Sequence, residues 1–100
     1  MTQPSYQIVR EAARVRLSGE FDINARDEMR TTLLEAVQSA PTEVVIDFGD
    51  AAFLDSEAMG ALIEGLNAGR EAGVPLRIVN AHGIVYRVLE VSGVLALFND

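Results

Sequence analysis

The stretch Val44-Val45-Ile46-Asp47-Phe48-Gly49-Asp50-Ala51-Ala52-Phe53-Leu54-Asp55-Ser56 decides the fold of this chain. It begins with apolar, β-branched residues, which are typical of a buried strand. After Ser56, apolar residues recur at helical spacing as far as Gly73, and Pro75 follows two residues later. The stretch therefore predicts a strand over Glu43 to Phe48, a short loop, and a helix that ends at Gly73.

Ser56 stands at the start of the predicted helix. The first N–H groups of a helix have no partner within it, and this end carries a partial positive charge. A hydroxyl there is well placed to cap the helix, to bind an anion or to carry a phosphate. The simpler interpretation, which spacing alone favours, is that either Asp55 or Ser56 is the N-cap residue.

Several segments around this stretch follow a pattern that is known from one family. Phe53-Leu54-Asp55-Ser56 and Gly60 read Phe-Leu-Asp-Ser-x-x-x-Gly, and an upstream strand ends in Gly19-Glu20-Phe21-Asp22. The downstream segments are Leu76-Arg77-Ile78-Val79, Val85-Tyr86-Arg87-Val88-Leu89 and Ser92-Gly93-Val94. Over nearly all of its length, the chain resembles the STAS domain family, which is the fold of bacterial anti-sigma factor antagonists.

The alternation of strands and helices predicts an α/β fold with parallel pairing. We expect one STAS-like domain over residues 1–100, with a mixed sheet of about four to five strands, an N-terminal antiparallel hairpin and then βαβα units. The other segments expected are strands at Tyr6 to Val9, Ala13 to Leu17 and Val94 to Phe98, and a first helix that Asn24 and Asp27 cap and Pro41 closes. Many relatives continue into another helix where this chain stops at Asp100, so we expect either a short variant or a missing C-terminal helix.

The resemblance also implies a function. In the family, a cognate serine kinase phosphorylates the position of Ser56, which implies a regulator that binds an anti-sigma factor kinase of the GHKL type until Ser56 is modified. The chain departs from the family pattern Asp-Ser-Ser/Thr-Gly-Leu-Gly, because Glu57, Ala58 and Met59 follow Ser56 before Gly60 agrees again. Ala58 suits a helix, but the carboxylate of Glu57 would repel a phosphate beside it.

The predicted helix has two different faces when its residues are placed at 3.6 per turn. The expected core stripe consists of Met59, Leu62, Ile63 and Leu66. The opposite side carries little bulk and has a border of carboxylates; its residues are Ala61, Gly65, Ala68 and Ala72, with Glu57, Glu64 and Glu71. A partner could approach the backbone there, although an exposed helix that is rich in Ala and Glu for helix propensity and solubility explains the pattern as well. Gly65 and Gly69 count against this second explanation, because glycine in an exposed helix costs about 0.5 to 1 kcal/mol relative to alanine.

The motifs and this helix face together define the expected partner-binding residues. They are Glu20, Asp22, Asp55, Ser56, Glu57, Gly60, Ala61, Glu64, Gly65 and Ala68.

Composition limits the kind of partner and compartment. A net charge of −7 and a pI near 4.5 argue against direct binding to nucleic acid or to an anionic membrane, and a basic protein fits better. The chain has no cysteine, which rules out a disulfide framework. Its N-terminus has no leader-like pattern, and no segment has the ~20 apolar residues of a membrane helix. A cytoplasmic location is expected.

The residues give little support for an enzyme, a metal site or a cofactor. His82 is the only histidine. Its simpler interpretation is as part of the loop and cap before the third helix, and not as a catalytic base for Ser56. One histidine with scattered carboxylates lacks the spacing of metal ligands, and phosphate-binding glycine motifs are absent. Asp47, Asp50 and Asp55 lie near the carboxyl end of a strand, where α/β ligand sites form. Without a base or a metal beside them, they are weak evidence for catalysis.

A second function remains open. The chain also resembles the short STAS proteins that serve as unphosphorylated accessory subunits of a bacterial lipid-transport ABC system and bind its ATPase. Chain length favours this alternative, whereas Phe53-Leu54-Asp55-Ser56 favours the phosphorylated regulator.

Overall fold

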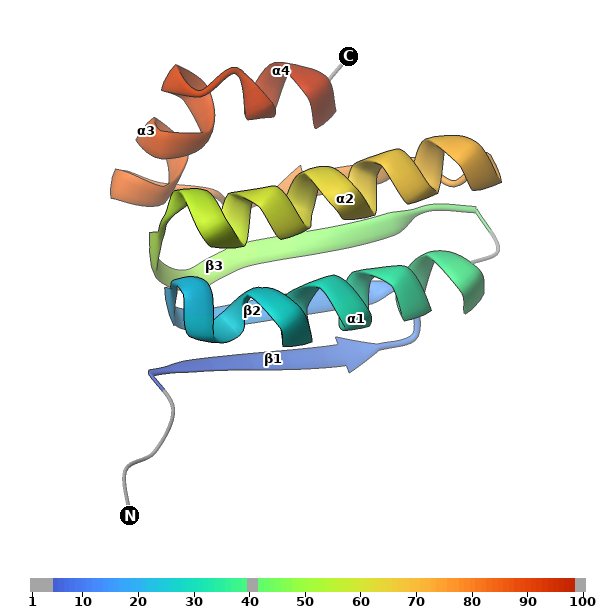
Figure 1. The fold of residues 1–100 in the computed structure, drawn as a ribbon, viewed down its shortest axis with the longest axis horizontal. Coiled ribbons are helices and arrows are strands. Elements are labelled where there is room, and N and C mark those ends of the chain that lie inside the picture. Colours follow the sequence, from blue (N-terminus) through green and yellow to red (C-terminus); the bar gives the residue numbers. More distant parts are fainter. Residues whose placement is uncertain (1–4, 40–41, 99–100) are drawn as a thin grey trace.

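The computed structural model describes residues 5–39 and 42–98 of the chain. Within them, the elements in chain order are β1 (Tyr6–Glu11), β2 (Arg14–Phe21), α1 (Ile23–Ser39), β3 (Val44–Leu54), α2 (Ser56–Ala72), β4 (Leu76–Val79), α3 (Gly83–Val91) and α4 (Val94–Phe98). Figure 1 shows α1 and α2 side by side in front of the strands, with α3 and α4 beyond α2. The helices and strands thus form two layers around one core.

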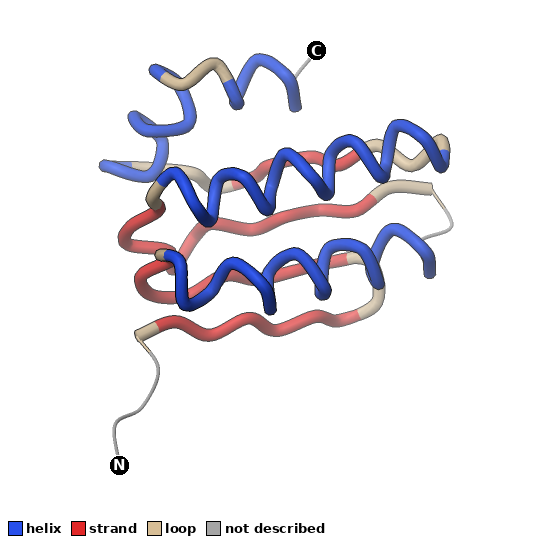
Figure 2. Tube along the Cα trace, in the orientation of Figure 1, coloured by secondary structure: helices blue, strands red, loops and turns tan. Residues whose placement is uncertain are grey.

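The strands form a single mixed sheet in the order β1-β2-β3-β4. The β1–β2 hairpin is antiparallel, whereas the β2–β3 and β3–β4 pairs are parallel. This topology confirms the predicted α/β fold, with its N-terminal hairpin and βαβα units. Because parallel strands point the same way, the carboxyl ends of β2, β3 and β4 meet at one edge of the sheet, and α1, α2 and α3 start beside it (Figure 2).

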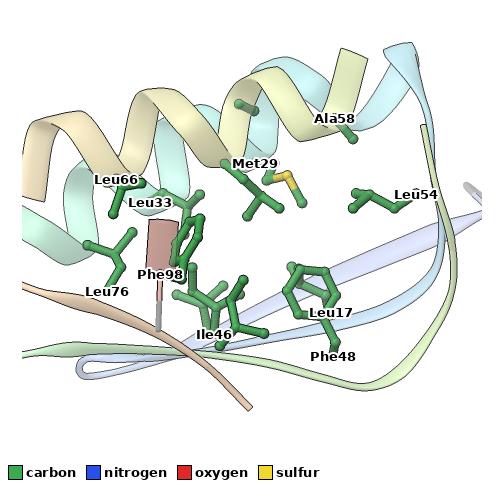
Figure 3. Close-up of a cluster of buried hydrophobic side chains, with 14 of the residues drawn as sticks. Leu17, Met29, Leu33, Ile46, Phe48, Leu54, Ala58, Leu66, Leu76 and Phe98 are labelled. Atoms are coloured by element: carbon green, nitrogen blue, oxygen red, sulfur yellow. The ribbon is translucent and has the colours of Figure 1, made fainter. Parts of the chain in front are cut away.

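The core lies between the sheet and the α1–α2 pair. In β3, Val44, Ile46 and Phe48 are buried and alternate with residues on the other face, as the two-residue period of a strand requires. Figure 3 shows Ile46 and Phe48 pointing from the sheet toward Leu33 and Leu66 of the helices. Most of the buried apolar side chains therefore belong to β2, β3, α1 and α2.

Helix α2 is rotated relative to the expected core stripe. Leu62 and Leu66 are buried as predicted, but Met59 and Ile63 are only half-buried. The helix packs against α1 as well as against the sheet, so two of its faces are covered. We predicted that a flat strip of small residues lies exposed on α2. This prediction is wrong where α1 covers the helix, as it does at Gly65.

The starts of the first two helices are capped by aspartates. Asn24 was expected to cap the first helix, but α1 starts at Ile23 and the Asp22 carboxylate accepts a hydrogen bond from the Asn24 N–H at 2.9 Å. Helix α2 starts at Ser56, as predicted, and Asp55 caps it. It ends as predicted at Gly73, whose φ of 72° is the left-handed conformation that glycine adopts readily.

The last described segment is a helix and not the predicted strand. Residues Val94–Phe98 form α4, in which Val94 and Phe98 are both buried. These two side chains are four residues apart, so one face of a helix carries both into the core. Pro41, expected to close the first helix, and Asp100 lie outside the described residues.

Strand β3 is longer than predicted. It continues past Phe48 to Leu54, because residues that were expected to form a loop pair with β2. The pairing has two register shifts, and it ends with Phe21 opposite Leu54. In the described residues, no helix is both long enough and apolar enough to cross a membrane.

Candidate functional site

Asp55 is the N-cap residue of α2. Its backbone is extended, and its Oδ1 accepts hydrogen bonds from the N–H groups of Glu57 and Ala58, both at 3.0 Å. Ser56 is therefore the first residue inside the helix, and its side chain is exposed. The Ser56 hydroxyl makes no hydrogen bond with another described residue. The structure resolves the two N-cap candidates in favour of Asp55 and leaves Ser56 free for another role.

The end of β2 lies beside this helix start. Glu20 pairs with Phe53 in the sheet, and the Asp55 N–H donates to the carbonyl of Phe21 at 3.0 Å. Asp22 follows directly and caps α1. The predicted site residues Glu20, Asp22, Asp55 and Ser56 are thus brought to one edge of the sheet, as the parallel topology requires.

Glu57 is turned toward α1. Its Oε1 lies 2.7 Å from Nη1 of Arg26, and the Arg26 Nε lies 3.3 Å from Asp27. The hydrogen bond with Glu57 is the main reason that the pKa of Arg26 is raised, and Asp27 adds to it. The negative charge next to Ser56 is therefore balanced by a guanidinium from the neighbouring helix.

A second pair continues the same seam between the helices. Glu64 Oε2 lies 3.5 Å from Arg30 Nε, and Arg30 also contacts Asp27 at 3.0 Å. Two of the three carboxylates that were expected to border an open strip thus face basic side chains of α1. Sequence reasoning missed Arg26 and Arg30, although helices that follow parallel strands run side by side and bring their first turns together.

The small residues of the predicted strip have different environments. Ala61 and Gly65 are both buried, and Gly65 lies against Leu33 of α1, so neither can contact a partner in the way expected of an exposed surface. Ala68 is half-buried. Gly60 is also half-buried, but a Cβ there would meet nothing within 4 Å, which leaves its surroundings open. Of the predicted strip, Ala68, Ala72 and the three bordering glutamates stay accessible. The predicted partner-binding residues of α2 that a partner can reach beyond Ser56 are therefore Glu57, Gly60, Glu64 and Ala68.

Another candidate acid, Asp47, is engaged in contacts within the sheet and the loop that follows it. Asp47 lies on the face away from the helices and accepts hydrogen bonds from Arg14 at 2.7 Å, the Gly49 N–H at 2.8 Å and Asn80 at 3.1 Å. Partial burial alone would raise the pKa of Asp47, but these three hydrogen bonds outweigh it and hold the pKa below its usual value. Asp47 is thus occupied with neighbours other than Asp55. Across the described part of the chain, no three His, Asp or Glu side chains are grouped to hold a metal ion.

His82 takes the position that the sequence predicts. It is the N-cap residue of α3, and its Nε2 lies 2.9 Å from the Gly49 carbonyl oxygen, which fits an N–H donor. The contact joins the start of α3 to β3. The ring is therefore engaged in holding the loop.

Two exposed apolar side chains near Ser56 were not anticipated. Ile23 opens α1 and is 54% exposed, and Phe53 precedes Leu54 in β3 and is 41% exposed. Simple alternation of buried and exposed residues along β3 does not predict the exposure of Phe53, because the register of β3 against β2 shifts before this residue. The edge around Ser56 thus combines carboxylates with apolar side chains, a composition that suits a protein partner.

Comparisons with known proteins agree with this fold. Residues 5–98 match the family model described as "Mlab, STAS domain". The Anti-sigma F factor antagonist of Paenibacillus polymyxa is 29% identical over 84 residues, which are 83% of this chain and 72% of that protein.

Solved structures show the same architecture. The anti-sigma factor antagonist SpoIIAA in its unphosphorylated form superposes with a TM-score of 0.73 at 22% identity, covering 92% of this chain and 84% of that one. An anti-sigma factor antagonist from Mycobacterium paratuberculosis has a TM-score of 0.73 at 21% identity, covering 98% and 87%. At these identities, the two structures support the fold and do not by themselves assign an activity.

Proposed function

Because the chain belongs to the STAS domain family, we propose that it is an anti-sigma factor antagonist-like regulatory protein whose switch is Ser56. In its unmodified form it binds an anti-sigma factor serine kinase of the GHKL type, which frees a sigma factor. The kinase then transfers the γ-phosphoryl group of ATP to Ser56 Oγ, and ADP and the hydroxyl proton leave. The modified protein is released. The chain acts as a binding module and as substrate, with the catalytic groups supplied by the partner, and this partner places it in the cytoplasm.

The observation that carries this proposal is that Asp55 caps α2, whereas the neighbouring Ser56 is exposed. Asp55 already accepts from the N–H groups of Glu57 and Ala58. Ser56 is exposed, and its hydroxyl makes no hydrogen bond with another described residue. A phosphate on Ser56 would meet the positive end of the α2 dipole and would not displace a cap. The free protein therefore tolerates the modification.

The complex responds differently to the same charge. A phosphate adds about −1.5 to −2 charges, and a partner surface that fits a neutral hydroxyl must either desolvate or repel them. We place the interface on the edge formed by Glu20, Asp22, Asp55 and Ser56, continued along α2 by the accessible residues Glu57, Gly60, Glu64 and Ala68. Ile23 and Phe53 supply apolar contact area on this edge, and the net charge of −7 favours a basic partner surface.

The test uses a purified GHKL-type anti-sigma factor kinase from the organism that encodes this chain. Incubation with ATP is expected to add one phosphate, mapped by mass spectrometry to Ser56, and Ser56→Ala is expected to abolish it. Binding to the same kinase, measured by titration calorimetry, should be lost on phosphorylation and kept in Ser56→Ala. Phosphate on a different residue would overturn the proposal.

A second candidate is the unphosphorylated accessory subunit of a bacterial lipid-transport ABC system, which binds the ATPase of that system. The observation that favours it is the description of the matching family model, which names Mlab and no antagonist. Co-purification with the ATPase and the permease, unchanged by Ser56→Ala, is the result that would favour this candidate over the first. Neighbouring genes for an ATPase and a permease would point the same way.

A further inference from the structure

The ion pair between Arg26 and Glu57 lies one residue from the proposed phosphorylation site. The Arg26 Nη1 is 2.7 Å from Glu57 Oε1, and the Cα atoms of Ser56 and Glu57 are about 3.8 Å apart, as in any trans peptide. Arg26 comes from the first turn of α1, so the contact joins the starts of two helices. A guanidinium is thus held at the residue next to Ser56 in the sequence before any modification takes place.

The charges around Ser56 would be rearranged by a phosphate. Glu57 is a single carboxylate, whereas a phosphate carries about −1.5 to −2 charges and three acceptor oxygens. The five N–H donors of an arginine match phosphate geometry in a two-pronged contact. The Arg26 side chain is long and 38% exposed, so its guanidinium can turn from one neighbouring acceptor to another. A phosphate on Ser56 would therefore compete directly with Glu57 for the same guanidinium.

We infer that Arg26 is the positioning residue of the Ser56 switch: it neutralises Glu57 while Ser56 is unmodified, and it pairs with the phosphate afterwards. The exchange replaces one ion pair between α1 and α2 with another and leaves the Glu57 carboxylate uncompensated. A partner then meets an unpaired Glu57 carboxylate as well as the phosphate. The inference rests on the proposed function for the identity of the modified residue, and it explains how this chain accommodates a glutamate next to that residue.

The test measures the phosphate directly, without a kinase. Full-length protein with phosphoserine installed at position 56 during translation is titrated by ³¹P NMR to obtain the second pKa of the phosphate. In Arg26→Gln this pKa is expected to rise by about 0.3 to 0.7 pH units, the size of one exposed ion pair. Arg26→Lys keeps the charge and should restore part of the difference, and Glu57→Gln, which removes the competing carboxylate, should lower the pKa.

Arg30→Gln is the matched control, because Arg30 lies one turn further along α1 and contacts Glu64 and Asp27. An equal rise in Arg26→Gln and Arg30→Gln would reduce the effect to general charge and overturn the inference, as would no rise in Arg26→Gln. Thermal unfolding of each variant checks that the fold is kept. Since the phosphate is installed by translation, the result does not depend on whether any kinase modifies Ser56, and the two proposals can fail separately.

Discussion

Gly65 of α2 faces Leu33 of α1 so closely that a Cβ atom on Gly65 would force one of the two residues to shift. A Cβ atom at Gly65 would lie 3.0 Å from Leu33 Cδ1 and 3.1 Å from Leu33 Cβ. These distances are shorter than ordinary van der Waals contacts, so either neighbour would have to move. Glycine at this position is what lets the two helices pack against each other.

Replacing Gly65 with a larger residue is therefore expected to destabilise the fold. Gly65→Gln should lose about 1 to 3 kcal/mol of unfolding free energy, the usual cost of overpacking, measured by urea denaturation. Gly60→Gln is the matched control, because a Cβ there has open space. It should be neutral or gain about 0.5 kcal/mol from better helix propensity. Similar midpoints for the two variants would contradict the packing of Gly65.

Leu62 tests the assignment of the core face of α2. Its side chain is fully buried, and Leu62→Ala is expected to cost about 2 to 5 kcal/mol. Met59 is on the same helix but half-buried, so Met59→Ala should cost clearly less. Chemical denaturation of both variants gives the comparison, and an equal loss would mean that Met59 belongs to the core after all.

Asp55 and Ser56 are expected to differ in their effect on stability. Asp55→Ala removes the cap of α2 and should cost about 0.5 to 2 kcal/mol. Ser56→Ala should leave the melting temperature nearly unchanged, because its hydroxyl makes no hydrogen bond in the described structure and alanine is a good helix former. The reverse order in thermal unfolding would show that Ser56, and not Asp55, caps the helix.

Most of the sheet and the first three helices could be predicted because their signals are local. The β-branched run at Val44 and the cap-and-glycine pattern between Asp55 and Gly73 depend only on neighbouring residues. The β1–β2 turn was harder to locate. It uses Ala12, whose φ of 55° is rare outside glycine and asparagine, and no turn residue marks it in the sequence.

The features that the sequence concealed depend on contacts between elements. A helical projection separates Leu62 from Gly65, but it cannot show that α1 covers the glycine side. The same holds for Arg26, whose role follows from a partner 31 residues away. The segment from Val94 to Phe98 resembles a strand in sequence, because five apolar residues are too few to show whether their period is that of a strand or of a helix. The chemistry of Ser56 was visible in the sequence, whereas its electrostatic surroundings were not.

Asp47 gives a prediction on pH. Its hydrogen bonds hold its pKa below that of an unfolded aspartate, so its charged form stabilises the fold. This contribution is complete above the unfolded pKa of about 3.9 and is lost as the pH falls through the lower folded value. Wild type should therefore exceed Asp47→Asn in stability at pH 7, and the gap should narrow below about pH 4. Asp50→Asn, which removes a carboxylate at an exposed position of the same strand, is the matched control. Equal acid profiles for both variants would contradict the role of Asp47.

The rate of phosphorylation offers the last prediction, because Arg26 should screen Ser56 from Glu57. With the cognate kinase, Arg26→Gln should slow phosphate incorporation by about two- to fivefold, the range expected from losing one exposed charge contact. In that background, Glu57→Gln should restore the rate, since it removes the carboxylate that was left uncompensated. In the wild-type background the same substitution should change the rate little, because Arg26 already balances Glu57. Initial rates for the two single variants and the double variant form a double-mutant cycle. A coupling energy of zero would mean that Glu57 acts on Ser56 independently of Arg26. A higher rate for Arg26→Gln than for wild type would mean that the guanidinium hinders the kinase.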